Sequence, residues 1–392
     1  MSLTGIRVLD LTRILAGPFC SMLLADMGAD VIKVETPGVG DPVRQQGAIR
    51  DGLSWYFAAY NRNKRSITLD LRAPEGRAVL EKLIARSDVL VENYRPGILA
   101  KMGFGEARLK EIKPDLVYCN ITGFGTSGPY RDRPAFDFIA QAMSGFMSVT
   151  GAPEDEPVRA GPPISDLVAG LYGALGVCAA LVGRNRTGTG DTVGSSLTNG
   201  LISFLSFLAA NYFASGTVPM RTGNDHGIAS PYGLFQTSDG EVAIAPSTEI
   251  VYGKLLEAIG APELRNHPAF LTNALRLKNR AAINAAIEAK LRANTSAHWI
   301  AVLNAAGVPC GLVMNLAEVF GDPQVREQEM VVSVDHPGHG TVEMLGFPLK
   351  FSAHPCRVRR PAPVLGADTD AILGEAGLTR DAIDGLRAKG VV

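Results

Sequence analysis

Residues 6–35 read IRVLDLTRILAGPFCSMLLADMGADVIKVE, and this stretch decides the fold. The apolar run Ile6–Leu11 predicts a strand, Gly17–Met27 predicts a helix, and Asp30–Glu35 predicts a second strand. Two strands joined by a helix are typical of a βαβ unit, in which the strands run parallel in one sheet. The stretch therefore indicates an α/β fold.

The same alternation continues outward to about residue 121. Further strands are expected at Ser66–Leu71, Asp88–Glu92 and Leu116–Ile121, with a helix over about Pro74–Arg86. Alternating strands and helices predict a parallel sheet, and the layout resembles a dinucleotide-binding domain. The first strand-to-helix turn, residues 10–18, holds one glycine instead of the G-x-G-x-x-G pattern, which argues against an NAD or FAD site of the usual kind.

The second half of the chain predicts a smaller domain. Asp239-Gly240 stands between two alternating runs within Gly233–Pro246 and predicts a hairpin, and amphipathic helices follow it. After about Val331 the sequence returns to strand-like runs and ends in two short helices. We expect a large domain formed by residues 1–213 and 331–392, with a small α/β domain, residues 225–330, inserted between them.

Composition limits the classes of partner. The chain has 38 basic and 39 acidic residues, so its charge favours neither nucleic acid nor an anionic membrane surface. Five cysteines without a C-x-x-C pair, and no visible signal peptide, favour a cytoplasmic location. The six histidines show no H-E-x-x-H or similar spacing, so no metal site is expected.

One apolar stretch requires a membrane test. Leu167–Gly183 is uncharged, but it has only 17 residues, four of them glycine. A spanning helix needs about 20 mostly apolar residues, so the stretch predicts a buried helix of a protein that does not span a membrane.

Asp166 is the only charged residue between Gly161 and Gly183. It follows two prolines at the expected start of this apolar helix, where free N–H groups and the helix dipole would keep a carboxylate ionised. A carboxylate in such surroundings is a candidate nucleophile. The alternative is structural, because Asp166 or Ser165 would also suit the N-cap of a buried helix.

Several motifs, in order along the whole chain, resemble the class III (CaiB/BaiF-like) CoA-transferase family. Together they are far more specific than any one alone. They are Val8–Phe19, Leu24–Glu35, Asn61–Ser66, Val91–Gly97, Thr122–Gly125, Gly128–Tyr130, Asp166 with its helix, Gly307–Gly311 and Ala362–Gly366.

This resemblance implies a fold, an assembly and a mechanism. It implies a Rossmann-like large domain, a small domain and two interlocked subunits. The aspartate that matches Asp166 would attack an acyl-CoA thioester and pass through a mixed anhydride to an aspartyl-CoA thioester, from which CoA moves to an acceptor acid. CoA and acyl-CoA would be substrates, and no permanently bound cofactor is implied. Water must be kept from the anhydride, which suits apolar surroundings.

The resemblance also implies the residues that contact CoA. Arg72, Arg95 and Lys101 would meet phosphates, although each would also suit solvated surface. Asn93 follows a strand end, where α/β sheets bind ligands. The full CoA-binding set is Leu15, Ala16, Leu69, Asp70, Leu71, Arg72, Asn93, Tyr94, Arg95, Lys101, Phe136 and Asp137.

Departures from the family pattern bear on the substrate. Oxalate/formate transferases carry glutamine and tyrosine where Leu15 and Phe136 stand here, so dicarboxylate transferases that use succinyl-type donors resemble this chain more closely. A related racemase family would need a histidine before Asp137, and that residue is Phe136. An α-methylacyl-CoA racemase therefore ranks below a transferase, and a non-enzymatic CoA-binding scaffold is the other alternative.

Overall fold

The computed structural model describes all 392 residues, which form two compact units. The first unit comprises residues 1–146, 159–210 and 323–392, and the second comprises residues 147–158 and 211–322. The sequence had suggested boundaries at 213, 225 and 331. Residues 147–158 thus group with the second unit, and no pattern in the sequence had indicated this.

The first unit is built on a six-stranded sheet in which every neighbouring pair is parallel. The predicted α/β fold with a parallel sheet is confirmed. From β1 the chain extends the sheet to one side through β2 and β5, then returns to the other side through β6, β7 and β8. In spatial order the strands are β5 (Lys64–Thr68), β2 (Asp30–Glu35), β1 (Arg7–Asp10), β6 (Val89–Glu92), β7 (Val117–Thr122) and β8 (Thr192–Ser196).

This order fixes where a ligand can bind. The connections after β1 and β6 leave the sheet in opposite directions, so the carboxyl ends of these neighbours border an open crevice. Open α/β sheets bind ligands at such a switch point. The strand order needs pairing information that the sequence pattern does not contain.

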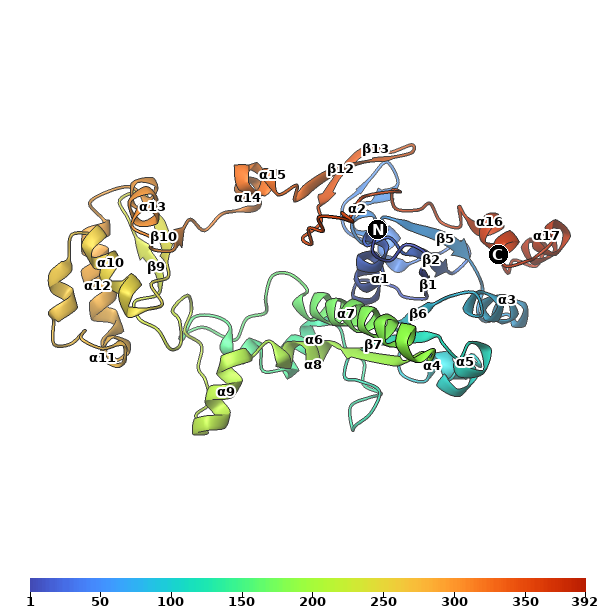
Figure 1. Cartoon of the computed structure of the whole chain (residues 1–392), viewed down its shortest axis with the longest axis horizontal. Coiled ribbons are helices and arrows are strands. Elements are labelled where there is room, and N and C mark those ends of the chain that lie inside the picture. Colours follow the sequence, from blue (N-terminus) through green and yellow to red (C-terminus); the bar gives the residue numbers. More distant parts are fainter. The chain divides into compact units, whose positions relative to one another are not determined.

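Helices cover both faces of the sheet (Figure 1). Successive strand residues point to opposite faces, so Leu9 joins a core with α3 (Pro74–Ile84) and α16 (Thr369–Glu375), whereas Val8 joins a core with α1 (Ala16–Asp26) and α7 (Ile164–Thr187). The remaining helices of this unit are α2 (Trp55–Asn61), α4 (Ile98–Lys101), α5 (Glu106–Ile112), α6 (Asp137–Met143), α8 (Leu197–Ser203), α15 (Pro323–Glu327) and α17 (Arg380–Ala388).

Helix α7 packs against α1 at very short range. A Cβ atom built on Gly170 would lie 2.5 Å from the carbonyl oxygen of Ala16, and one on Gly173 would lie 3.2 Å from the Cys20 sulfur. These glycines, which argue against a membrane-spanning helix, allow the two helices to pack closely. The opposite face of α7 is open, since Leu175 is 60% and Val182 is 62% exposed, so the expectation of a fully buried helix is wrong.

By length and composition alone α7 could cross a membrane, and the bent pair of α8 and α9 (Ser206–Ser215) would pass the same test as one span. Core helices of soluble proteins also pass it. The inner face of α7 is occupied by α1 and β7, which provides a structural reason for its apolar sequence.

Two hairpins complete the predicted strand pattern. In the first unit β12 (Val331–His336) and β13 (Gly340–Leu345) place Val342 against Phe57 of α2. In the second unit β9 (Gly233–Gln236) and β10 (Glu241–Ile244) are joined through the predicted Asp239-Gly240 turn, and β10 also pairs with β11 (Cys310–Gly311). The short remaining strands are β3 (Ile49–Arg50) and β4 (Leu53–Ser54).

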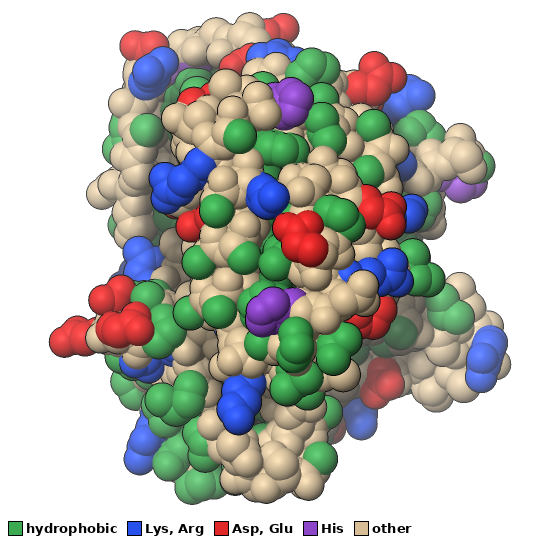
Figure 2. Space-filling view, turned by 90° about the vertical axis from the view of Figure 1, so that its left-hand side faces the viewer, with side chains coloured by type: hydrophobic (Ala, Val, Ile, Leu, Met, Phe, Trp, Pro, Cys, Tyr) green, Lys and Arg blue, Asp and Glu red, His purple; other side chains and the backbone are tan.

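Helices pack on this small antiparallel sheet around Phe235, Tyr252 and Trp299. They are α10 (Glu249–Ala258), α11 (Asn273–Lys278), α12 (Arg280–Leu291) and α13 (Ser296–Ala305), with α14 (Leu316–Gly321) closing the second unit. On the face of the molecule that Figure 2 shows, acidic and basic side chains are interspersed and neither sign forms a continuous patch.

Candidate active site

The turn after β1 is held by buried polar groups. Asp10 accepts hydrogen bonds from the backbone N–H (2.8 Å) and hydroxyl (2.5 Å) of Thr12. Burial alone would raise the pKa of Asp10, but the nearby ammonium groups of Lys64 and Lys33 bring it down to about 2. Asp10 therefore stays charged and fixes the start of the turn.

Asn93 ties this turn to the end of β6. Its side-chain oxygen accepts from the Arg13 N–H at 3.0 Å, and its amide nitrogen donates to the Arg13 carbonyl at 2.8 Å. Ile14 comes next with φ +70°, a conformation that a β-branched residue rarely adopts, while its N–H donates to Asp41 at 3.1 Å. Bonds from two sides thus hold a strained turn in one conformation.

A cavity of about 260 Å³ opens at this switch point between β1 and β6. It brings together seven of the residues that the sequence proposed for the site: Leu15, Ala16, Asn93, Tyr94, Arg95, Phe136 and Asp166. The other lining residues are Arg13, Ile14, Pro42, Pro96, Ile121, Thr122, Gly123, Arg131, Arg133, Pro134, Ala135 and Leu197.

The other six proposed residues do not line this cavity. Leu69 is buried in the core beside α3, with Leu71 packed against the same core. Arg72 is paired with Asp70 at 2.9 Å and is 84% exposed, and Lys101 is exposed at the end of α4. Their contact with CoA stays a prediction, as does that of Asp137, which the structure places in the support of α7.

Asp166 lies in the first turn of α7 and accepts no hydrogen bond or ion pair from the chain. Its carboxyl group borders the cavity. Burial, helped by the nearby carboxylate of Asp137, raises its pKa from the ordinary 3.8 to about 7. The sequence had suggested that the helix terminus would keep Asp166 ionised, but desolvation and a like charge oppose this effect, so the carboxyl group is only partly ionised at neutral pH.

Asp137 holds the first turn of α7 from outside the helix. Its Oδ1 accepts the backbone N–H of Ser165 at 2.9 Å and the Ser165 hydroxyl at 2.8 Å, and Gln141 donates to its Oδ2 at 2.7 Å. The N-cap position is Pro163, which has no capping side chain. Neither Ser165 nor Asp166 is the N-cap, so the structural alternative for Asp166 fails and its carboxyl group stays available.

Two tyrosines near Asp166 were missed in the sequence. Tyr56 and Tyr60 pack edge to face on α2, with ring centroids 5.7 Å apart. Burial, together with the charges of Tyr60 and Asp166, raises the pKa of Tyr56 to about 12, and burial and Asp166 also raise that of Tyr60. No motif or spacing linked these residues to a helix that begins about a hundred residues later.

The sequence also missed three of the four arginines that line the cavity, because only Arg95 was proposed as a contact residue. Arg131 and Arg133 join Arg13 and Arg95 there. The Arg133 guanidinium lies 3.8 Å from the ring centre of Tyr130, and that of Arg13 lies 5.8 Å from the ring centre of Tyr94. Guanidinium groups favour phosphates and carboxylates, so the cavity suits an anionic ligand.

Asp166 is the only carboxyl group among the residues that line the cavity. None of its lining residues is a histidine, and Phe136, which is 70% exposed, stands directly before Asp137. Three or more His, Cys, Asp or Glu side chains do not gather anywhere in the chain in a way that could hold a metal ion. What the arrangement can do is present one unpartnered carboxyl group to an anionic ligand in partly apolar surroundings.

Comparison with known proteins agrees with this chemistry. A family model described as CoA-transferase family III matches residues 3–369. Human succinyl-CoA:glutarate CoA-transferase is 37% identical over 392 residues, which cover 100% of this chain and 90% of that protein. Acetyl-CoA:oxalate CoA-transferase from Acetobacter aceti is 38% identical over 373 residues, covering 95% of each protein.

A solved structure supports the same assignment. The crystal structure of a CAIB/BAIF family protein from Brucella suis matches with a TM-score of 0.83 and 39% identity, covering 95% of this chain and 98% of that one. Family, sequence and fold therefore agree over nearly the whole chain. The protein belongs to CoA-transferase family III and is a CoA-transferase.

Proposed function

We propose that the enzyme moves CoA from an acyl-CoA donor to a carboxylic acid through an aspartyl-CoA thioester on Asp166. The carrying observation is the position of Asp166, whose carboxyl group borders the switch-point cavity without a partner in the chain. A carboxylate that accepts no hydrogen bonds from the protein has its lone pairs available to attack an electrophilic carbon.

In the first half-reaction, an oxygen of Asp166 attacks the thioester carbonyl of the donor. The C–S bond breaks, CoA leaves as the thiolate, and a mixed anhydride forms. The thiolate then attacks the Asp166 carbonyl carbon and releases the donor acid as its carboxylate. The acceptor carboxylate repeats both steps in reverse order, so no proton or electron is gained or lost overall.

The surroundings of Asp166 favour these steps. Ile14, Leu15 and Leu197 contribute apolar wall to the cavity, and limiting water there protects the anhydride from hydrolysis. With a pKa of about 7, a large share of Asp166 is ionised at neutral pH, and the ionised form is poorly solvated. Such a carboxylate loses little solvation on attack, which supports its role as nucleophile.

We propose a dicarboxylic acid as the acceptor and succinyl-CoA as a donor. The matched human relative is named for succinyl-CoA and glutarate. The cavity has four arginines, and guanidinium groups bind carboxylates as well as phosphates, so one of them is a candidate partner for the distal carboxylate of a dicarboxylic acid. The absence of histidine from the lining disfavours the racemase alternative, which needs a proton carrier beside the α-carbon.

The test is mass spectrometry of the enzyme after incubation with succinyl-CoA. Trapping with hydroxylamine or borohydride should modify Asp166 in the wild type and leave no modification there in Asp166→Ala. Asp381→Ala, which removes an exposed aspartate of α17 without a partner, is the control and should react like the wild type. Full exchange activity in Asp166→Ala would refute the proposal.

A second incubation, with a different substrate, distinguishes the racemase. In D₂O, rapid deuterium uptake at the α-carbon of a 2-methylacyl-CoA, without exchange of carboxylates, would favour that activity. CoA binding without either reaction would favour the non-enzymatic scaffold.

We also propose that the enzyme is an interlocked homodimer in the cytoplasm. The first unit exposes a row of large apolar side chains on α6, α7 and α8, among them Ile139, Leu175 and Ile202. A second copy is the occupant that the family resemblance implies. Light scattering should give twice the mass of one chain, and Leu175→Glu should shift it toward the monomer, whereas a monomeric wild type would refute the dimer.

A further inference from the structure

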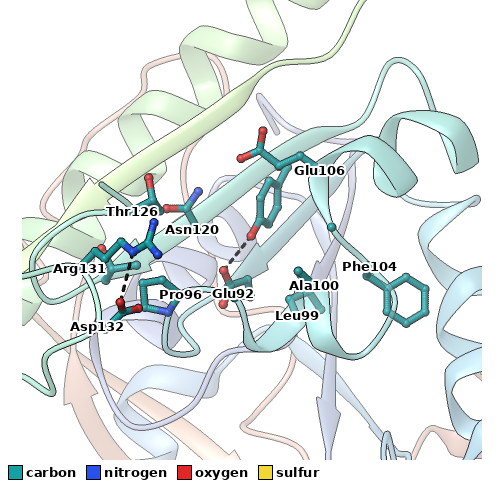
Figure 3. A pocket seen from close by; sticks show the side chains of 14 residues that line it. Glu92, Pro96, Leu99, Ala100, Phe104, Glu106, Asn120, Thr126, Arg131 and Asp132 are labelled. Atoms are coloured by element: carbon teal, nitrogen blue, oxygen red, sulfur yellow. Dashed lines mark hydrogen bonds and ion pairs between the residues drawn. The ribbon is translucent and has the colours of Figure 1, made fainter. Parts of the chain in front are cut away.

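A second cavity, of about 270 Å³, lies one strand further along the sheet, beside the ends of β6 and β7 (Figure 3). Pro96, Thr122 and Arg131 line both this cavity and the one that contains Asp166. The wall between the two cavities therefore includes the segment that follows β6.

Glu92 is the last residue of β6 and only 5% exposed. Its Oε2 accepts the backbone N–H of Tyr94 at 2.6 Å, and its Oε1 accepts the Tyr118 hydroxyl at 2.9 Å, the bond that Figure 3 marks beside Glu92. One carboxyl group thus joins the neighbouring strand β7 to the segment that lines the first cavity.

That segment forms part of the wall of the first cavity and is held from more than one direction. Tyr94 and Arg95 line the Asp166 cavity, and Asn93 makes the two hydrogen bonds to Arg13 described above. The Tyr94 N–H is held by Glu92, which lines the second cavity. Asn93 is held by the turn after β1, which borders the first cavity. The two contacts together set the path of the wall.

We propose that Glu92 is a positioning residue for acyl-CoA, which holds Asn93–Arg95 against the turn after β1 so that the cavity wall is formed before the substrate arrives. This inference rests on the proposed function, because it takes acyl-CoA to be the ligand of the first cavity. A wall formed in advance improves affinity by reducing the ordering cost of binding.

The ionisation of Glu92 adds a second readout. Burial raises its pKa to about 7, against the opposing effect of the Tyr118 and Tyr94 hydrogen bonds. The groups that face it are the hydroxyl of Tyr118 on β7 and the N–H of Tyr94, and the charged side chains around the same cavity are Glu106, Arg131 and Asp132. Above pH 7 the Tyr94 N–H donates to a carboxylate, and a bond to a charged acceptor is the stronger one.

The experiment measures the Kd of CoA by calorimetry, and kcat and KM by CoA exchange, at pH 5.5 and 8.5. Glu92→Leu keeps the volume but removes both acceptors, and should weaken CoA binding by about tenfold at pH 8.5 while kcat stays within about twofold. Glu92→Gln keeps an acceptor without charge. It should bind CoA about threefold more weakly than the wild type at pH 8.5 and equally at pH 5.5.

Two controls separate positioning from general support of the sheet. Tyr118→Phe removes the β7 hydrogen bond but leaves that to Tyr94, and should keep the Kd within about twofold. Glu106→Gln neutralises a carboxylate of the same cavity that makes no bond to the wall and should leave the Kd unchanged.

An unchanged Kd in Glu92→Leu, or an equal loss in Tyr118→Phe, would overturn the proposal. If Glu92→Leu does not fold, Glu92→Gln decides, because a ratio of Kd values to the wild type that is the same at both pH values would also overturn it. A wild type that neither binds CoA nor exchanges it would instead refute the proposed function, so the two failures are distinguishable.

Discussion

Asp137 Oδ1 lies 2.8 Å from the Ser165 hydroxyl and 2.9 Å from the Ser165 backbone nitrogen, one residue before the proposed nucleophile. The same carboxylate that fixes the start of α7 therefore sets a negative charge beside Asp166. One side chain thus fixes the position of the nucleophile and adds to the effect of burial in raising its pKa, which leads to the first prediction.

Replacing Asp137 by asparagine should lower the pKa of Asp166. The amide oxygen can still accept from Ser165, while the like charge that helps to raise the pKa to about 7 is removed. The rise of kcat/KM with pH, which reports the free enzyme, should then move from a midpoint of about 7 to lower pH. Asp132→Asn, an exposed neighbour on the preceding loop, is the control, and an unmoved midpoint in Asp137→Asn would contradict the account.

Asp166→Asn should stabilise the protein at high pH. The folded-state pKa of Asp166 is raised, so its favourable contribution is complete below the ordinary value of 3.8 and is lost as pH rises to about 7. At pH 8 this corresponds to at most about 4 kcal/mol, reduced by the partial exposure of the group. Calorimetry at pH 4 and pH 8 should show a gain in Tm for the variant only at the higher pH, and a gain of equal size at both would contradict the assigned cause.

Gly170→Ala should damage both stability and turnover. The added methyl group would meet the Ala16 carbonyl oxygen at 2.5 Å, and backbone cannot move aside cheaply, so a loss of about 1–3 kcal/mol is expected. Gly183→Ala, in the same helix with no atom within 4 Å of the added group, is the matched control. It should gain up to about 1 kcal/mol from helix propensity. Thermal unfolding and kcat would check both, and equal effects would argue against the packing of α1 on α7.

Lys64→Met should destabilise the first unit strongly. Lys64 Nζ lies 3.0 Å from Asp10 Oδ2, and both side chains are fully buried, so removal of this cation leaves the buried Asp10 carboxylate without its direct ion-pair partner. The expected loss is about 3–5 kcal/mol. The double variant Asp10→Asn/Lys64→Met should recover part of it in denaturant titrations, and a double variant as unstable as the single one would show that the pair is not coupled.

The sequence predicted what depends on local pattern or on whole motifs. The βαβ stretch 6–35 predicted the parallel sheet. The family resemblance proposed Leu15, Asn93, Phe136 and Asp166 as site residues, and all four line one cavity. It could not predict the strand order, since pairing depends on contacts between distant segments. For the same reason Arg133 and Tyr56 were missed, because neither stands in a recognisable spacing with Asp166.

The partial ionisation of Asp166, where the sequence suggested an ionised carboxylate, has a physical origin. A position at a helix terminus can be read from prolines and apolar residues, and it suggested stabilisation of the ionised form. Burial and the approach of Asp137, which lies 29 residues earlier in the chain, act in the opposite direction. Their size depends on tertiary packing that periodicity does not encode.

The close approach of Gly170 to Ala16 also has a mechanical consequence. Helix α7 carries the nucleophile and α1 begins at the turn that borders the cavity, and contact at backbone distance locks the two helices into one rigid body. Any adjustment to acyl groups of different length must then come from the other walls, such as the loop around Arg133. The position of the reacting Asp166 oxygen relative to the turn after β1 stays the same.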